Sequence, residues 1–123
     1  MTQEDKNLLL QDLCSRLPYG VKIDIPDLFV STKNNIEVLN EIFCGDDGEF
    51  RCNNSGMLIK HVKPYLFPIS SMTGEQKSSH NFLKNSAYAN PISLIKFYHK
   101  NHFDYNKLIP KGLANDATGL NIY

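Results

Sequence analysis

The sequence lacks tryptophan, long apolar runs and the paired cysteines of a small secreted protein. Its three cysteines, Cys14, Cys44 and Cys52, are an odd number without CxxC spacing, which argues against a disulfide framework and a structural zinc site. The N-terminal stretch MTQEDKNLLL has an acidic start and resembles neither a signal peptide nor a membrane span. We therefore expect a cytoplasmic protein with reduced thiols that does not associate with membranes.

Net charge is absent too, because thirteen acidic side chains balance thirteen basic ones. No overall field therefore draws the chain to nucleic acid or to anionic lipid. The charges are nonetheless uneven along the chain, with acidic residues concentrated before residue 50. The C-terminal third contains five lysines, Lys84, Lys96, Lys100, Lys107 and Lys111. Such asymmetry usually marks a solvated face, and a local basic patch is the alternative.

The recognisable motifs of enzymes are also missing. There is no glycine-rich phosphate loop and no nucleophile elbow. Cys44 or Cys52 with His61 makes only a generic Cys–His pair, without a family-specific cysteine signature. The acidic residues at 46–49 lack the ligand spacing of a calcium loop, and a solvated hairpin tip explains them better. We therefore predict that the protein is not an enzyme and binds no cofactor.

What is present fits one ordered domain spanning residues 1–123. A chain of 123 residues is long enough to bury one core, and its content of 41% hydrophobic and 21% charged residues is ordinary for a globular protein. A disordered chain of this length would have fewer apolar residues and a larger net charge.

The N-terminal segment, residues 2–17, predicts a helix. Thr2 is a suitable N-cap with Asp5 three residues later, although a capping box prefers Glu or Gln there. Pro18 and Gly20 should end the helix. Apolar residues recur at three- and four-residue spacing and form one stripe: Leu9, Leu10, Leu13, Cys14 and Leu17.

The middle of the chain predicts short strands joined by turns. Residues 21–25 alternate apolar and polar side chains as a half-buried strand does, and residues 31–35 indicate a turn. Residues 36–44 favour a strand, with a helix as the open alternative because Ile36, Leu39 and Phe43 also fit a helix face. After a turn, 49–54 is the returning strand, and 57–62 is another short strand.

The second half predicts a loop, two helices and a tail. Two prolines within KPYLFPISSM, residues 63–72, favour an ordered crossing loop. A helix is expected over 73–88, and Asn90 followed by Pro91 predicts the start of a helix that ends near Asn101. The tail at 116–123 should lie along the surface. The expected fold is α+β, with an N-terminal and a C-terminal helix packed on one side of a small, mainly antiparallel sheet.

Two histidines and an aspartate near the end of the last helix are the strongest metal-binding pattern. His99 and His102 are three residues apart on neighbouring helix positions, and Asp104 adds a carboxylate. However, helical zinc motifs more often use histidines four residues apart, and this pair straddles the expected helix end. We therefore predict no metal site, with His102 capping the helix or packing beside Phe103 and Tyr105.

Two surfaces are candidates for binding a macromolecule. Tyr65, Leu66 and Phe67 stand between two prolines and would present large apolar groups to a protein partner, unless they cover the core. Lys96, Lys100 and Lys107 are interleaved with aromatic residues, the mixture that stacks bases and holds phosphates. Because those aromatic residues also fit a helical core pattern, nucleic-acid binding is the second hypothesis.

Three blocks, EDKNLLLQDLCSRLPYGVK, IKHVKPYLFPISSMT and NHFDYNKLIPKGLA, resemble a family of short uncharacterised proteins of gut Bacteroidales and their phages or prophages. The resemblance implies a phage-linked context but assigns no activity, ligand or functional residue. Together with the missing catalytic motifs, it leads us to expect a non-catalytic accessory factor that binds a host or phage protein. The alternative is a nucleic-acid-binding protein that uses the basic, aromatic C-terminal third.

Overall fold

The computed structural model describes residues 1–25, 35–85 and 90–123, and within them the chain is α+β, as predicted. The helices are α1 (Gln3–Arg16), α2 (Gly74–Asn85) and α3 (Pro91–Lys100). The strands are β1 (Lys22–Ile25), β2 (Asn35–Val38), β3 (Ile42–Cys44), β4 (Phe50–Cys52), β5 (Met57–Leu58), β6 (Lys63–Leu66) and β7 (Asn115–Asp116). Three short 3-10 turns, η1 (Leu17–Tyr19), η2 (Ile59–His61) and η3 (Ile69–Ser71), complete the described elements.

Helix α1 begins as the sequence predicts. The Thr2 hydroxyl accepts a hydrogen bond from the Asp5 amide at 3.1 Å, and the Asp5 carboxylate accepts one from the Thr2 amide at 3.4 Å. These two bonds form a complete capping box, in which aspartate occupies the position that more often holds glutamate. The helix buries Leu9 and Leu13 completely and continues into η1, which ends at Gly20 in the left-handed conformation, with a φ of 70°.

The larger sheet has the strand order β2-β1-β6-β7. β1 pairs antiparallel with β2 and β6, whereas β6 pairs parallel with β7. The prediction of a crossing loop over 63–72 is therefore wrong for 63–66, which form an interior strand. Pro64, opposite Ile23, is compatible with this position because β6 pairs with β1 over only two residues and then with β7.

Residues 36–44 form strands, as favoured, and the helical alternative is wrong. The segment splits between two sheets, because β2 belongs to the larger sheet and β3 to a smaller one of order β3-β4-β5. At the crossing, Leu39 is buried in the core at 1% exposure. The predicted strand over 57–62 is also shorter than expected, since it turns into η2 after Leu58.

A single buried amide stabilises this crossing. Asn53 is 3% exposed and has a φ of 57°, a left-handed conformation that asparagine tolerates better than most residues. Its side-chain oxygen accepts from the Asn40 amide at 2.9 Å, and its Nδ2 donates to the Val38 carbonyl at 2.9 Å and to the Glu37 carboxylate at 3.2 Å. Asn53 therefore connects the end of β2 to the smaller sheet.

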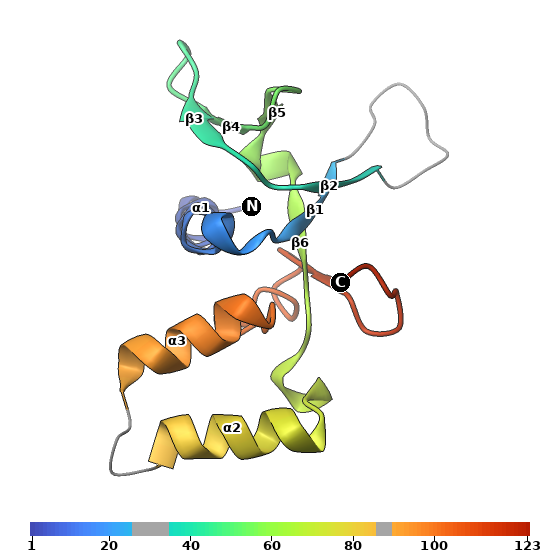
Figure 1. Cartoon of the computed structure of the whole chain (residues 1–123). Coiled ribbons are helices and arrows are strands. Elements are labelled where there is room, and N and C mark those ends of the chain that lie inside the picture. The colour runs from blue at the N-terminus through green and yellow to red at the C-terminus, as the bar shows by residue number, and fades with distance from the viewer. Residues whose placement is uncertain (26–34, 86–89) are drawn as a thin grey trace.

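The hydrophobic core lies where α1 meets the strands and the C-terminal segment (Figure 1). Each fully buried leucine or valine contributes about 1.5–3 kcal/mol relative to an exposed one. The buried cluster draws on residues from both ends of the chain: Leu9, Leu13, Val21, Ile23, Ile25, Leu39, Cys52, Ile59, Val62, Leu66, Leu108, Leu113 and Ala114.

Helices α2 and α3 form a helical hairpin below the sheet (Figure 1). The predicted Asn90 cap is confirmed, since its side-chain oxygen accepts from the Ile92 amide at 2.9 Å and Pro91 opens the helix. The predicted helix over 73–88 is confirmed as α2 up to Asn85, and its last predicted residues, 86–88, lie outside the described residues. Most of the predicted turn at 31–35 falls outside them as well. Helix α2 has no buried residue.

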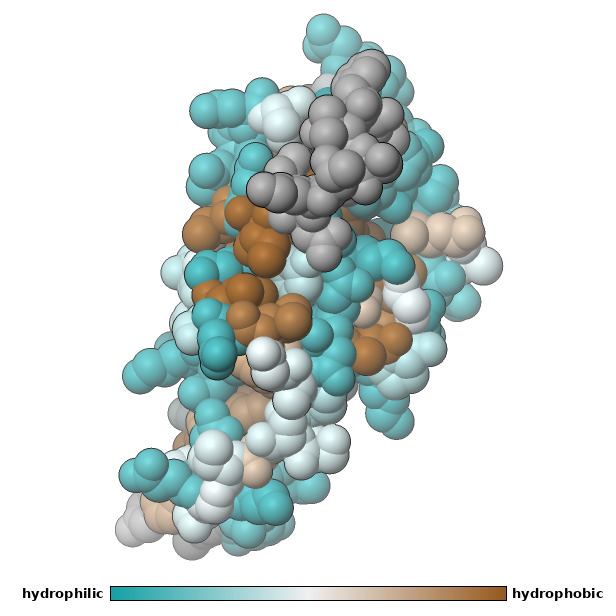
Figure 2. Space-filling model, turned by 90° about the vertical axis from the view of Figure 1, so that its right-hand side faces the viewer, coloured by the Kyte–Doolittle hydropathy of each residue, from teal (hydrophilic) through white to brown (hydrophobic). Residues whose placement is uncertain are grey.

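The tail lies along the surface, and one side chain secures its end. The Tyr123 hydroxyl donates to the Tyr65 carbonyl at 2.8 Å and accepts from the Lys22 amide at 2.7 Å. On the face that carries residues 116–123, hydrophobic residues lie among hydrophilic ones (Figure 2).

None of the described helices has the length and apolar composition that crossing a membrane requires.

Candidate functional site

Most of the apolar side chains predicted to be exposed between Pro64 and Pro68 are buried. Tyr65 and Leu66 are buried, at 3% and 0% exposure, because β6 is an interior strand. The expectation that they face a partner is therefore wrong. Phe67 is half-buried, with its ring centroid 6.5 Å from that of Phe103 and 5.8 Å from that of Tyr123. This stretch mainly covers the core, which was the competing interpretation.

The predicted basic, aromatic surface has its exposed lysines but, within the described residues, lacks exposed aromatic rings that are free to stack on bases. Lys96, Lys100 and Lys107 are exposed, and none has an ion-pair partner among the described residues. The aromatic rings, however, stack on each other. Phe103 is 1% exposed, and the Tyr98 and Tyr105 rings lie 5.2 Å apart. Stacking on bases would require these rings to leave their present partners.

The three side chains of the predicted metal-binding pattern make other contacts: His99 and Asp104 form hydrogen bonds, and His102 stacks on Tyr123. His99 Nε2 bonds to the Tyr105 hydroxyl at 2.7 Å, and the Asp104 carboxylate accepts from the amides of Leu108 and Ile109 at 2.8 and 2.9 Å. Asp104 thus caps the turn that follows it. Within residues 1–25, 35–85 and 90–123, no three His, Cys, Asp or Glu side chains are placed to hold a metal ion.

Cys44 and Cys52, the two candidate nucleophiles, lie in different environments. Cys52 is buried, and its pKa is raised to about 11 by that burial and by the charge of Glu37, so it remains a neutral thiol. Cys44 is exposed, and its Sγ donates to the Gly45 carbonyl at 3.6 Å. Neither sulfur is hydrogen-bonded to His61 or to another histidine within the described part of the chain.

Helix α1 contains a buried ion pair that was not predicted from the sequence, and both of its residues form hydrogen bonds to the C-terminal segment. Arg16 Nε lies 2.6 Å from Asp12 Oδ1, and both side chains are 0% exposed. Arg16 also donates to the Phe103 carbonyl at 2.7 Å, and Asn106 donates to Asp12 at 2.8 Å. The guanidinium carbon lies 5.2 Å from the Tyr105 ring centroid. An Asp and an Arg four residues apart are common on exposed helix faces, so their spacing alone did not reveal burial.

His102 lies beside this junction. Its ring stacks on Tyr123 with a centroid distance of 3.7 Å, and its φ is 59°. Burial, followed by the charges of Arg16 and Lys22, lowers its pKa from 6.5 to about 4. The folded protein therefore binds this proton less readily than the unfolded chain does, so the contribution of neutral His102 to stability is complete above pH 6.5 and is lost as the pH falls towards 4.

We expect His102→Asn to weaken the acid sensitivity of folding. Asparagine tolerates the left-handed backbone and carries no titrating proton. The variant should be less stable at pH 7, because the stack on Tyr123 is lost, but its stability should fall less between pH 7 and pH 5 than that of the native chain. Urea unfolding at several pH values measures both quantities. Parallel pH profiles for the two proteins would contradict the assigned role.

An apolar groove lies beside the predicted apolar stretch. It has a volume of about 320 Å³, and its wall is almost entirely apolar. One side is formed by Pro68 and Ile69, at the start of η3, and the other by the turn that Asp104 caps. Lys107, with a φ of 58°, lies at this groove and is exposed. The lining residues are Pro68, Ile69, Asp104, Tyr105, Lys107, Ile109 and Pro110.

A second groove, of about 240 Å³, lies between α1 and the β3–β4 turn. Polar and apolar atoms contribute equally to its wall, which includes Lys6, Glu49 and Lys60. Two of its polar side chains already bond to each other, since Gln3 Nε2 donates to Asn7 Oδ1 at 3.1 Å. The groove at residues 68–110 is therefore the better site for an apolar ligand.

The helical hairpin also exposes apolar residues that were not predicted to lie on the surface. Phe82, Ile92 and Ile95 are 60%, 64% and 41% exposed. A signal was present, because the apolar residues of α3 cover every side of the helix except that of Ser93, Lys96 and Lys100, and a face this wide cannot lie entirely against the core. Comparison of the chain with protein-family models, with curated proteins and with solved structures finds no match.

Proposed function

We propose that the protein is a non-catalytic factor that binds another protein through the groove at residues 68–110. The observation that supports this function best is the groove itself: about 320 Å³ of open space with an almost entirely apolar wall. Apolar concave surfaces with a few polar groups at the edge are typical of binding sites.

The chemistry of the groove favours an extended segment with an apolar side chain next to a carboxylate. The apolar side chain would contact Ile69 and Ile109, and the carboxylate would pair with Lys107 at the edge. Pro68 and Pro110 restrict the backbone of both walls, so docking costs little conformational entropy.

We further propose that the protein acts in the cytoplasm as an accessory factor of phage or prophage origin, with a host or phage protein as its target. This part of the proposal is supported by the resemblance of the three sequence blocks. Two of those blocks, IKHVKPYLFPISSMT and NHFDYNKLIPKGLA, supply the two walls of the groove.

Capture of tagged protein from a nuclease-treated host lysate tests the proposal, with variants that separate the groove from the general charge. We expect one stoichiometric partner whose recovery falls about tenfold with Lys107→Glu, corresponding to about 1.4 kcal/mol, and at least as much with Ile69→Ser. The matched control is Lys111→Glu, an equal charge change at an exposed lysine that does not line the groove. Equal recovery with all four proteins would contradict the groove as the binding site.

Nucleic-acid binding is the second candidate, and the exposure of Lys96, Lys100 and Lys107 supports it. In a parallel capture from lysate without nuclease, it predicts recovery of many proteins, and this recovery should disappear after nuclease treatment. It also predicts that salt weakens the association, because neutralised phosphates release counterions. Since the aromatic rings stack internally, we expect this outcome less than the first.

A further inference from the structure

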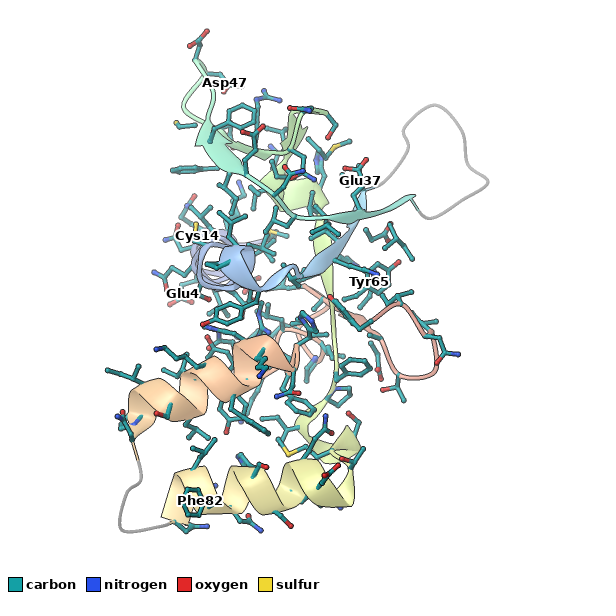
Figure 3. The ribbon with its side chains drawn as sticks, viewed as in Figure 1. Glu4, Cys14, Glu37, Asp47, Tyr65 and Phe82 are labelled. Atoms are coloured by element: carbon teal, nitrogen blue, oxygen red, sulfur yellow. The ribbon has the colours of Figure 1, made fainter. Side chains whose placement is uncertain are left out.

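The charges of this neutral chain are separated between its two halves. Ten of the thirteen acidic residues precede residue 51, and nine of the thirteen basic residues follow residue 50. The fold keeps part of this separation in space, because the β3–β4 turn lies at one end of the molecule and the α2–α3 pair at the other (Figure 1). Figure 3 shows the labelled Asp47 and Phe82 at these opposite ends.

The first end, which we call the acidic hairpin, comprises residues 41–51. It contains four carboxylates and one arginine. Arg51 pairs with Asp47 at 2.8 Å, whereas Asp46 and Glu49 are exposed and have no ion-pair partner among the described residues. Phe43 and Phe50 are 39% and 43% exposed on the same hairpin.

The second end, which we call the basic hairpin, comprises α2 and α3. Its exposed lysines include Lys84, Lys96 and Lys100, none of which is paired within the part of the chain that the structure describes. Glu75 is the single acidic residue of the two helices. The exposed Phe82, Ile92 and Ile95 provide the apolar component. This end therefore repeats the composition of the acidic hairpin with the opposite sign of charge.

We propose that the chain self-associates head to tail, with the acidic hairpin of one copy docked on the basic hairpin of the next. Carboxylates would then meet lysines around a contact between exposed apolar residues, whereas joining two like ends would place charges of one sign together. Because the two surfaces differ, the contact is heterologous and can continue beyond two copies. No residue that lines the groove at 68–110 belongs to either hairpin, so this inference is independent of the proposed function.

Sedimentation velocity of the full chain tests the proposal, in reducing buffer because Cys14 and Cys44 are exposed. We expect the mean sedimentation coefficient to rise between about 0.01 and 1 mM protein at low salt. It should return towards the monomer value in about 0.5 M salt, where exposed charges are screened over a few ångströms. A native chain that remains monomeric throughout this range at low salt would overturn the proposal.

Charge reversal identifies the surfaces. Asp46→Lys with Glu49→Lys makes both ends basic, and Lys96→Glu with Lys100→Glu introduces acidic residues into the basic end. Each variant alone should associate at least tenfold more weakly than the native chain. An equimolar mixture of the two, or one chain that carries all four changes, should associate again because opposite charges face each other.

The matched control is Lys63→Glu with Lys111→Glu, which changes the net charge as much as the reversal in α3 but uses exposed lysines outside both hairpins and outside the groove at 68–110. It should associate like the native chain. If this control loses association as well, net charge rather than these two surfaces controls self-association. If the two reversed variants fail to associate when mixed, the acidic hairpin and the basic hairpin do not face each other. Either result shows that the proposal is wrong.

Discussion

Replacing Arg16 with alanine is expected to lower the free energy of unfolding by about 3–5 kcal/mol, as is typical when one partner of a buried ion pair is removed. The Asp12 carboxylate would remain buried with only Asn106 and no counter-charge, and the Phe103 carbonyl would lose its donor. Chemical denaturation of native and variant protein measures the difference.

The chain contains a matched control for this prediction. Asp47 and Arg51 form the same kind of pair at the same four-residue spacing, but their side chains are 51% and 32% exposed. Arg51→Ala should therefore cost only about 1 kcal/mol or less. Combining Arg16→Met with Asp12→Leu should recover much of the lost stability, because no unpaired charge remains buried. Similar losses for Arg16→Ala and Arg51→Ala would show that burial does not set the strength of the Asp12–Arg16 pair.

Replacing Asn53 with alanine is expected to lower the free energy of unfolding by about 2–4 kcal/mol. The substitution leaves the Asn40 amide and the Val38 carbonyl without their partner at the crossing between the two sheets. It also places a residue with a Cβ, but without a compensating side-chain bond, at a φ of 57°. Thermal and chemical unfolding of the purified variant measure the loss.

Asn53→Gly separates the two causes. Glycine adopts the left-handed conformation readily but makes none of the side-chain hydrogen bonds. We expect it to be more stable than Asn53→Ala by about 1 kcal/mol and still clearly less stable than the native protein. If glycine restored native stability, backbone conformation alone would explain the effect and the buried amide would not stabilise the crossing.

The helix starts were predictable because their causes are local. Thr2 and Asp5 lie within one turn of each other, as do Asn90 and Ile92, and the bonds between them need no other part of the chain. The alternation at 21–25 was similarly sufficient for β1. These elements have the residue ranges that the local patterns indicate.

Strand β6 was missed because its stability depends on distant partners. Pro64 and Pro68 favour a loop when only neighbouring residues are considered. The strand forms because Ile23 and Asn115, far away in the sequence, lie on either side of it. Its interior position also explains why Tyr65 and Leu66 are buried. The groove was invisible for the same reason, since its two walls are separated by more than thirty residues.

The charged residues were the most predictable part of the candidate surfaces. Lys96, Lys100 and Lys107 are exposed, as their charge favours. Their grouping with aromatic rings was not predictable, because the same spacing serves both a nucleic-acid surface and an internal stack. The internal bonds of Tyr98 to His80 and of Tyr105 to His99 show that the stack is what formed.

The junction around Arg16 also bears on the order in which the molecule assembles. Its bonds to Phe103 and Asn106 span 87 and 94 residues of chain, so closing it costs far more loop entropy than forming α1 itself. Contacts of such long separation slow the folding of small proteins. Helix α1 can form early from its own cap and apolar stripe, but its ion pair acquires its remaining partners only when the chain beyond α3 has returned to it.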